Sequence, residues 1–312
     1  MIGGGIFLYS QQAEEMLGID FAGGSTARIH LNKEVSIGEL RSKLDGFQVT
    51  VIKADSSSSA ADISTDFQVK RKLSPEDRAA GIATTKIEGG KDLAEEMVQE
   101  LEISLAGLLP QKPNGDTDLD QAFPQKSTVG ARVSGAIQNS AVRAILLALV
   151  LIVVYMNFRF SEYRYGLAAV AALFHDVLIT LGVLALVSKM GLVHVEINLE
   201  IIAAFLTIIG YSLNDTIVVF DRIRENLPRR KEKFSEIINI SINQSLSRTI
   251  LTSVTTFAVV TVLFLANRKF HNTLEGFSFA MLVGIIIGTY SSIFVASPLL
   301  IFFDRWARKK KV

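Results

Sequence analysis

The sequence lacks several residue types and motifs on which common kinds of chemistry depend. It contains no cysteine, which excludes disulfide bonds, catalytic thiols and cysteine-ligated metal sites. Its four histidines are scattered without the spacing of metal ligands, so we predict no metal and no cofactor. The G-x-x-x-x-G-K-S/T loop of ATPases, the H-E-x-x-H pair of metalloproteases and the G-x-S-x-G turn of hydrolases do not occur. We therefore expect a protein that is not an enzyme.

An excess of charge of either sign is also missing. The formal net charge is +1, which provides no bulk attraction to nucleic acid, and we expect no nucleic-acid partner. Hydrophobic residues make up 49% of the chain, and they are unevenly spread. Residues 11–130 have an ordinary soluble composition, whereas residues 140–303 are mostly apolar runs with short polar breaks. This division predicts a membrane domain and one small soluble domain.

The soluble region has the pattern of a small α+β sandwich. Alternating apolar residues predict strands at residues 25–31, 47–53 and 67–73. Helical spacing predicts helices at residues 36–44, with Ser36 as N-cap, and at residues 91–108. Residues 54–61 are expected to form a loop and residues 110–124 a polar linker. The order β-α-β-β-α is typical of a ferredoxin-like unit.

A glycine-rich segment, residues 18–24, precedes the first strand. Asp20, Gly23 and Gly24 suit a sharp turn with positive φ, and a simple turn into the strand explains them. The segment follows no predicted strand and opens no helix, which argues against a phosphate-binding loop.

The apolar region contains five runs long enough to cross a bilayer. They follow a polar amphipathic helix at residues 129–140 and lie at about residues 141–155, 165–187, 197–220, 250–265 and 277–303. Residues 1–9 are apolar but too short to span. They are either an interfacial segment or the end of a first membrane helix whose start is missing, and we favour the second.

The distribution of basic residues predicts the orientation. One set of breaks and the tail carries most of them: Arg159, Arg164, Arg222, Arg224, Arg229, Arg230, Lys231, Lys233, Arg305, Arg308, Lys309, Lys310 and Lys311. The opposite breaks carry Lys189, Arg268 and Lys269. The positive-inside rule then places the C-terminus in the cytoplasm and the α+β domain outside. A translocated domain needs an earlier span, which makes six crossings.

The expected organisation is therefore a polytopic α-helical membrane protein with a small extracytoplasmic α+β domain. Residues 1–10 are expected to be a remnant of the first membrane helix, and residues 11–128 the extracytoplasmic domain and linker. Residues 129–304 would form a membrane domain of five helices, and residues 305–312 a basic cytoplasmic tail.

Ionisable residues within the apolar runs are the candidates for function. A carboxylate at membrane depth is costly unless it is paired, hydrated or protonated, and proton or ion movement is the usual reason for one. Asp215 and Asp176 lie within predicted spans, and Arg248 lies where the fourth complete span begins. An Asp215–Arg248 pair could switch when Asp215 is protonated, although a static polar contact between helices is the alternative. We predict a proton relay of Asp215, Arg248 and Asp176.

Neighbouring residues are predicted to support these groups. Hydrogen bonds around Asp215 are expected from Asn214, Ser212 and Thr216, and His175 is a supporting polar residue beside Asp176 in the second complete span. Close helix packing is expected at Gly210, Gly284 and Gly288, the last two of which form a small-xxx-small pair. The basic loop at residues 221–233 either docks acidic partners or lipid head groups or merely sets the orientation.

Four segments together resemble the SecF branch of the SecD/SecF family of bacterial protein-export membrane proteins, within the resistance-nodulation-division superfamily. They are GIDFAGG at residues 18–24, FHDVLI at 174–179, GYSLNDTIVVFDRIRENL at 210–227 and SLSRT at 245–249. The resemblance covers nearly the whole chain, except that most of a first helix is absent.

The resemblance implies a protein of the bacterial cytoplasmic (inner) membrane with six spans and an extracytoplasmic domain between the first two. It implies SecD, the SecYEG channel and the translocating preprotein as partners, beside membrane lipid, and use of the proton gradient to draw preproteins outward. Asp215 matches the family's proton-relay aspartate and Arg248 its partner arginine.

Two other hypotheses stay open from the sequence. The first is half of a small-molecule exporter with the same fold, which would need an outer pocket lined with aromatic residues. Residues 25–110 contain only Phe47 and Phe67 as aromatics, which argues against it. The second is a purely structural assembly subunit, which would tolerate neutralisation of Asp215, Asp176 and Arg248 together.

Overall fold

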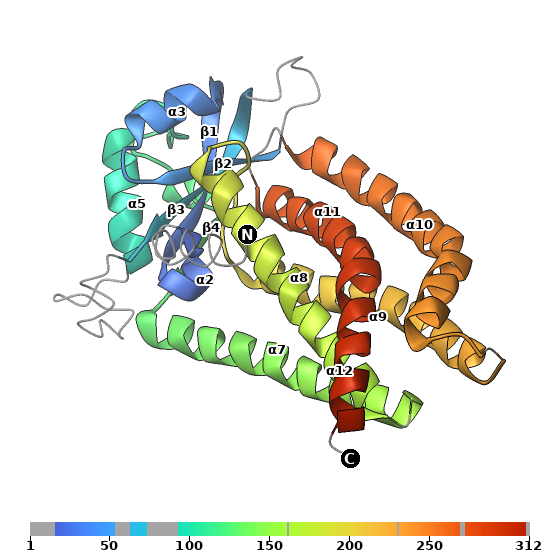
Figure 1. Ribbon diagram of the computed structural model, residues 1–312. Coiled ribbons are helices and arrows are strands. Elements are labelled where there is room, and N and C mark those ends of the chain that lie inside the picture. Colours follow the sequence, from blue (N-terminus) through green and yellow to red (C-terminus); the bar gives the residue numbers. More distant parts are fainter. Residues whose placement is uncertain are drawn as a thin grey trace.

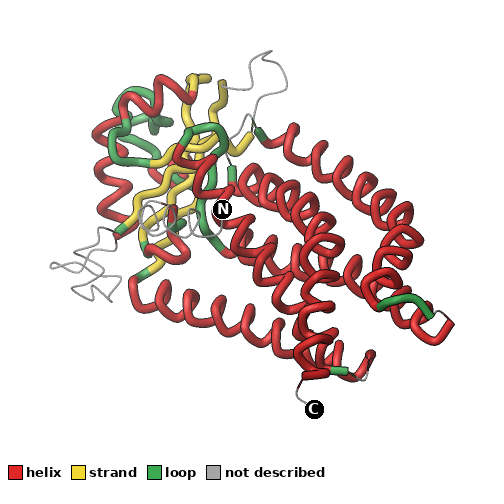
Figure 2. The backbone as a smooth tube through the Cα atoms, in the orientation of Figure 1, coloured by secondary structure: helices red, strands yellow, loops and turns green. Residues whose placement is uncertain are grey.

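The computed structural model describes residues 16–53, 63–73, 93–160, 162–229, 231–268 and 272–309, apart from the side chains of residues 131, 132, 308 and 309. Within these ranges, a small sheet with its helices lies at one end of a group of long helices (Figures 1 and 2). The predicted remnant of a first membrane helix (residues 1–10) and the predicted loop at residues 54–61 lie outside the described residues.

The sheet unit combines strands and short helices that alternate along the chain. Its elements are α2 (Ile19–Ala22), β1 (Gly24–Ser36), α3 (Ile37–Lys43), β2 (Gln48–Lys53), β3 (Ile63–Lys72), α5 (Leu93–Ser104), α6 (Leu119–Ala122) and β4 (Gln125–Val129). The four strands are antiparallel, in the order β2-β3-β1-β4. With helices α3 and α5 between the strands in sequence, this is the β-α-β-β-α-β arrangement of ferredoxin-like domains.

The predicted α+β class is confirmed, but the sequence analysis missed strand β4. It begins directly after the predicted polar linker and pairs with β1, with Gly24 opposite Val129. Strand β4 carries exposed polar residues and lacks the apolar alternation that marked the other strands. The prediction of Ser36 as an N-cap is confirmed, because its Oγ accepts a hydrogen bond from the backbone N–H of Glu39 at 3.2 Å.

Large aliphatic side chains form the core of the sheet unit on the face covered by α3 and α5. Leu40 of α3, Leu101 of α5 and Phe67 of β3 are completely buried there. The other face of the sheet is polar and turns toward the long helices (Figure 1). The covered face stabilises the unit, and the polar face is free to make contacts with the rest of the chain.

Long helices form the second part of the molecule. They are α7 (Ala131–Phe160), α8 (Tyr163–Lys189), α9 (Leu199–Asn226), α10 (Phe234–Asn267), α11 (Thr273–Ser291) and α12 (Ser297–Lys309), with a 3-10 turn after α9 (Leu227–Arg229). Helices α11 and α12 are joined by a π-helical segment, Ser292–Ala296. Among the described residues, these helices provide five segments long and apolar enough to cross a membrane.

Two of the predicted spans differ from the helices observed. The fourth was expected from residue 250, but α10 begins at Phe234, because its first turns are polar and the apolar pattern does not mark them. The fifth was expected at about residues 277–303, and the span observed there contains a π-helical segment that the apolar pattern does not mark. A single π turn leaves backbone hydrogen bonds shifted by one residue and often occurs at functional sites.

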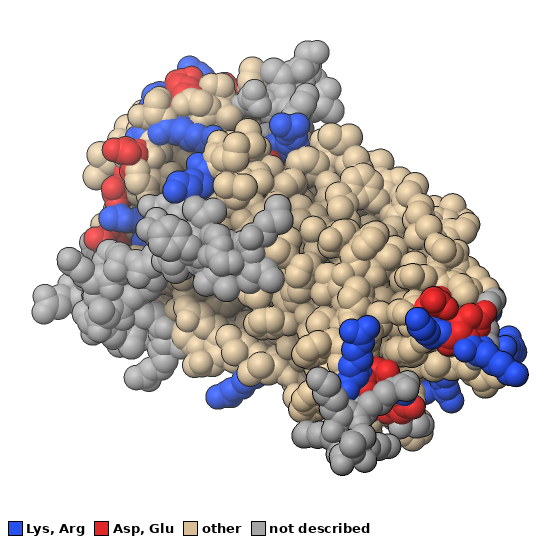
Figure 3. Space-filling model, in the orientation of Figure 1, with Lys and Arg blue, Asp and Glu red and all other residues tan. Residues whose placement is uncertain are grey.

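The cationic breaks between the helices lie together at the end opposite the sheet. Arg159, at the end of α7, pairs with Asp221 of α9 at 2.6 Å, and Arg164 of α8 pairs with Asp304 of α12. Figure 3 shows most charged side chains of the visible face near the sheet unit and at this far end, with a wide band between them in which one basic side chain projects at the lower edge. The band matches the helix segments that are long enough to cross a membrane.

Candidate functional site

Among the described residues, the long helices hold four buried carboxylates: Asp176, Asp215, Glu275 and Asp304. Asp176 and Asp215 lie on neighbouring helices in the middle of the bundle, whereas Glu275 lies in the first turn of α11 and Asp304 in α12. Asp176 of α8 is 1% exposed and Asp215 of α9 is 2% exposed. Each lies far from the ends of its helix, in a segment apolar enough to span a membrane. Carboxylates at such positions are expensive and are a functional-site hypothesis by default.

Asp176 is surrounded by hydroxyl and imidazole groups from three helices. Its Oδ2 accepts hydrogen bonds from Ser212 Oγ of α9 at 2.6 Å and from Ser291 Oγ of α11 at 2.7 Å. Its Oδ1 lies 3.0 Å from His175 Nδ1, on the same helix. These contacts satisfy both oxygens and hold α8, α9 and α11 together at this level.

Asp215 is bonded to Ser253, which belongs to a different set of hydroxyls. Ser253 of α10 donates to Asp215 Oδ2 at 3.4 Å, and Tyr211, one turn before Asp215, donates to Ser253 at 3.3 Å. Thr289 of α11 lies 2.7 Å from Ser253, oxygen to oxygen. The result is a branched chain of hydroxyl groups that leads from the carboxylate across α10 to α11.

Each hydroxyl in this chain has one proton and can donate only one hydrogen bond, so the hydroxyls cannot donate to all of their neighbours at the same time. If Ser253 donates to Asp215, then Thr289 must donate to Ser253. If Thr289 instead donates to the carbonyl oxygen of Ile285, 2.8 Å away, Ser253 can donate to Thr289. A protonated Asp215 could then donate its proton to the hydroxyl oxygen of Ser253. The chain therefore accommodates Asp215 in either protonation state without moving a heavy atom.

Close packing of α9 against α11 brings the hydroxyls within reach of the carboxylates. A Cβ at Gly284 would lie 2.3 Å from side-chain atoms of Ile208, and one at Gly288 would lie 2.9 Å from Ser212 Cβ. Only glycine permits this approach, which places Ser212 between α11 and Asp176. The structure thus agrees with the packing expected for Gly284 and Gly288.

Four expected contacts with Asp215 are not found among the described residues. Ser212 was expected to bond to Asp215, but its hydroxyl donates to Asp176. The side chain of Arg248 is exposed and makes no ion pair with Asp215 there. Asn214 is exposed, because it projects from the opposite side of α9. Thr216 is buried but donates to the backbone oxygen of Ser212 at 3.1 Å, and not to Asp215. Neutral hydroxyls therefore take the places expected for a cation and an amide.

Gly210 was expected to allow close helix packing, and this prediction was wrong for the described residues. A Cβ there would meet no atom within 4 Å outside the neighbouring helix backbone. Gly210 lies on the exposed side of α9, as Asn214 does one turn later. The small size of glycine at this position is therefore not used by the packing within this chain.

Sequence reasoning missed Ser253, Thr289 and Ser291, which complete the two clusters. Serine and threonine are common in membrane helices, where they often bond to the preceding turn, so no local pattern distinguishes these three. Their spacing from predicted residues was the available signal. Only Ser291 carried such a signal, since it follows Gly288 by three positions on the same helix face.

The arrangement contains no candidate for a resident metal. Among the described residues, no three histidine or acidic side chains are grouped to hold an ion. The carboxyl, hydroxyl and imidazole groups that are present can gain, lose and transfer protons.

The predicted turn at residues 18–24 has a structural role next to the helix that carries Asp215. Asp20 Oδ2 accepts a hydrogen bond from the backbone N–H of Leu199, the first residue of α9, at 3.3 Å. Gly23 has a φ of 73° and leads into Gly24, where β1 begins. The motif therefore lies where the sheet meets the membrane helices.

Comparison with protein families gives a match over most of the chain. Residues 111–306 match the family model described as "Protein export membrane protein SecD/SecF, C-terminal". The protein translocase subunit SecF of Desulfurispirillum indicum is 42% identical over 290 residues, which cover 92% of this chain and 81% of that protein. SecF of Rhodothermus marinus is 56% identical over 178 residues, 57% of this chain and 56% of that protein.

Among solved structures, SecDF from Thermus thermophilus, a translocon-associated membrane protein, has a similar fold. It superposes with a TM-score of 0.68 at 31% identity, over 97% of this chain. The chain spans 36% of that longer protein.

Proposed function

This chain belongs to the SecD/SecF family of protein-export membrane proteins, and we propose that it is an accessory subunit of the bacterial Sec translocase. In this proposal it assists export of preproteins across the cytoplasmic membrane and uses the proton-motive force to do so. Its partners would be a SecD protein, the SecYEG channel, the translocating preprotein and the surrounding lipid.

One observation carries the proton-driven part of the proposal. Asp215 is 2% exposed within a membrane-spanning segment, and the side chain that hydrogen-bonds to it among the described residues is a neutral hydroxyl, that of Ser253. A static structural role would favour a paired cation, which would offset the cost of the buried charge. A carboxylate that takes up and releases a proton needs neighbours that can both donate and accept, and hydroxyls can do both.

The proposed cycle alternates two hydrogen-bond patterns around Asp215. In the charged state the carboxylate accepts from Ser253, and in the protonated state it donates along the hydroxyl chain toward Thr289. Arg248 lies on the same helix as Ser253, so rotation or sliding of α10 would bring it toward Asp215 in another state. Movement of one charge through the membrane potential supplies about 2.3 kcal/mol per 100 mV.

Asp176 is proposed to take part in the same relay through α9. Ser212 bonds to Asp176, and Asp215 lies three residues further along the same helix. A change in the position of α9 would therefore act on both carboxylates together. The Asp176 cluster also includes Ser291, the last residue before the π-helical segment, where α11 is open to rearrangement.

The proposed orientation places the sheet unit outside the cell and the C-terminus in the cytoplasm. Its support is the gathering of Arg159, Arg164 and Arg224 with the C-terminal helix at the end opposite the sheet. Protons would then enter from the side of the sheet unit and leave toward the cationic end.

The decisive experiment is Asp215→Asn in proteoliposomes that hold the chain with its SecD and SecYEG partners. We expect the variant to assemble normally, and the stimulation of preprotein transport by a proton gradient to be lost completely, because an amide cannot cycle a proton. Transport without a gradient should be unchanged.

Asp221→Asn is the matched control, since it makes the same chemical change on the same helix at a half-exposed ion pair. It should retain gradient stimulation. Full stimulation in Asp215→Asn would refute the proton role. Full stimulation after neutralising Asp215, Asp176 and Arg248 together would favour a purely structural subunit.

A further inference from the structure

The chain that precedes the sheet is bonded directly to the start of α9. The backbone N–H of Gly18 donates to the oxygen of Ile197 at 2.8 Å, and the N–H of Ile197 donates to the oxygen of Met16 at 2.7 Å. Leu17 and Ile197 thus form a short parallel bridge immediately before helix α9. This contact connects segments that are far apart in the sequence.

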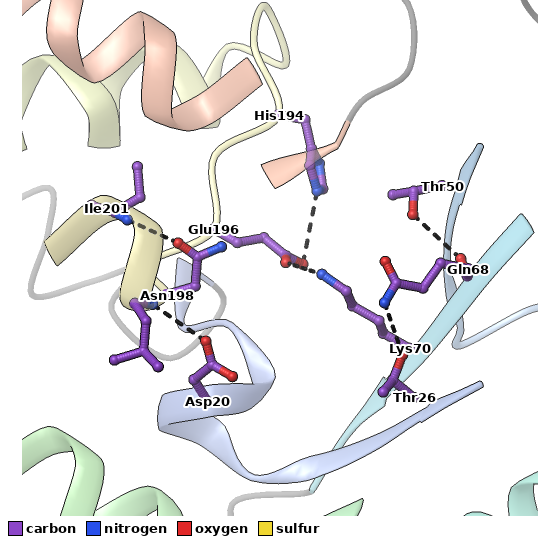
Figure 4. Close-up of polar contacts among 10 residues, drawn as sticks. Asp20, Thr26, Thr50, Gln68, Lys70, His194, Glu196, Asn198 and Ile201 are labelled. Carbon is purple, nitrogen blue, oxygen red and sulfur yellow. Dashed lines mark hydrogen bonds and ion pairs between the residues drawn. The ribbon is translucent and has the colours of Figure 1, made fainter. Parts of the chain in front are cut away.

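Two side chains then cap the first turn of α9 (Figure 4). Asn198 Oδ1 accepts from the backbone N–H of Ile201 at 3.0 Å, and Asp20 Oδ2 accepts from that of Leu199 at 3.3 Å. Asn198 is the ordinary N-cap of the helix, whereas Asp20 comes from the sheet unit. A carboxylate at a helix N-terminus is also favoured by the helix dipole. The first turn of α9 is therefore capped by a residue of the sheet unit as well as by its own N-cap.

No flexible linker separates Asp20 from the sheet. Asp20 lies in the single turn of α2, and Gly24, four residues later, is already the first residue of β1. A Cβ at Gly24 would lie 2.2 Å from the backbone oxygen of Arg71, and the N–H of Leu73 donates to the oxygen of Gly23 at 3.0 Å. Gly23 and Gly24 are therefore fixed against the end of strand β3, while Asp20 binds the start of α9.

A buried ion pair forms a second connection between the sheet and the same loop. Lys70 Nζ of β3 lies 3.0 Å from Glu196 Oε2, and the two side chains are 9% and 5% exposed. His194 Nε2 lies 3.8 Å from the other carboxylate oxygen (Figure 4). Burial by itself would raise the pKa of Glu196, but Lys70, His194 and Lys72 outweigh this and hold the pKa below its usual range.

Separating the sheet from this loop would leave charges without partners in a buried place. Removing one member of such a pair is strongly destabilising, because the other charge remains uncompensated. Glu196 is only two residues before the N-cap Asn198, so displacement of the pair acts directly on the start of α9.

We propose that the 18–24 motif and the Lys70–Glu196 pair form a rigid joint that makes the sheet unit and α9 move as one body. Helix α9 carries Ser212 and Asp215, so the joint transmits movement between the outer sheet and both carboxylate clusters. The rigid connection is independent of the function proposed above. Its use in transport rests on that function.

The absence of cysteine permits a direct test of the joint with two engineered labels. Spin labels at Gln125→Cys on β4 and Thr207→Cys on α9, both at exposed positions, report the distance from sheet to helix in the complete chain. Pulsed electron resonance should give one narrow distance peak for the parent. Glu196→Gln combined with Asp20→Ala should lose that single peak and give a broad distribution.

Two further variants separate the joint from general loss of stability. Glu100→Gln breaks the exposed Arg71–Glu100 pair within the sheet unit and should leave the narrow peak unchanged. Lys70→Met with Glu196→Met replaces the pair by an apolar contact of similar size and should also retain it. An unchanged narrow peak in Glu196→Gln with Asp20→Ala would overturn the proposal, and a broad peak in the double methionine variant would show that charge is indispensable to the joint.

Transport assays then test whether the joint transmits movement. Glu196→Gln with Asp20→Ala should reduce gradient-stimulated transport although Asp215 is intact, and the Glu100→Gln control should not. A broad distance distribution with normal stimulation would overturn transmission and leave only a structural joint. Failure of the proton role itself would be seen separately, as normal stimulation in Asp215→Asn.

Discussion

In the sheet unit, large apolar side chains such as Leu40, Leu101 and Phe67 are enclosed, and most exposed positions are polar. The membrane helices differ from the sheet unit in both their exposed and their buried side chains. Leu147, Val259 and other large apolar residues are exposed, while the interior of the described helices includes serines, threonines and four carboxylates beside its apolar contacts. The sheet unit therefore buries its apolar side chains, as expected in water, whereas the membrane helices expose theirs, as expected in lipid.

The difference reflects what each part gains by burying a side chain. In water, enclosing an aliphatic side chain is worth about 1.5–3 kcal/mol. In lipid that gain vanishes, and helices associate through close contact of small residues and through hydrogen bonds. Gly284, Gly288, Ser212 and Ser291 show this second kind of association, and it leaves room inside the bundle for polar groups that can hold protons.

The strongest test of the comparison makes one substitution in each region. Leu101→Ala, at a completely buried position of the sheet unit, should lower the free energy of unfolding by about 2–5 kcal/mol. Leu265→Ala, at a position of α10 that is 60% exposed, should change it by less than about 0.5 kcal/mol. Thermal unfolding of the purified protein in lipid nanodiscs measures both. Equal losses would mean that the two regions do not follow different rules.

A smaller effect is expected from overfilling the contact between α9 and α11. Gly284→Leu forces a side chain against Ile208 and should destabilise the bundle by about 1–3 kcal/mol. Gly210→Leu is the matched control, because a Cβ there meets nothing within 4 Å outside its own helix in the described residues. The same thermal assay applies to both. A loss in the control as large as that in Gly284→Leu would contradict the assigned packing.

The smallest effect concerns pH and the ion pair where the two regions meet. The pKa of Glu196 is held below its usual value, so its stabilising contribution is complete above the unfolded-state pKa of about 4.3. The contribution is lost as the pH falls through the folded-state pKa. The advantage of the parent protein over Glu196→Gln in melting temperature should therefore shrink on acidification from about pH 7 to about pH 3. An advantage that grew in acid would contradict the assigned pairing.

Local patterns in the sequence determined the elements whose signal is periodic and continuous. Apolar runs located the membrane helices, alternation located β1, β2 and β3, and a serine before a helical pattern identified the N-cap Ser36. The same local logic identified Asp176 and Asp215, since a carboxylate within an apolar run is conspicuous without knowledge of its neighbours.

Tertiary structure decided which side chains meet. The hydroxyl of Ser253 reaches Asp215 and that of Thr289 reaches Ser253, whereas Arg248 makes no ion pair with Asp215 in the described residues, because the relative rotation of α9, α10 and α11 fixes which faces touch. The pairing of Lys70 with Glu196, 126 positions apart, and the addition of β4 to the sheet follow from chain topology. A sequence pattern specifies the face that a helix or strand presents, but the partner on that face is set only when distant elements pack together.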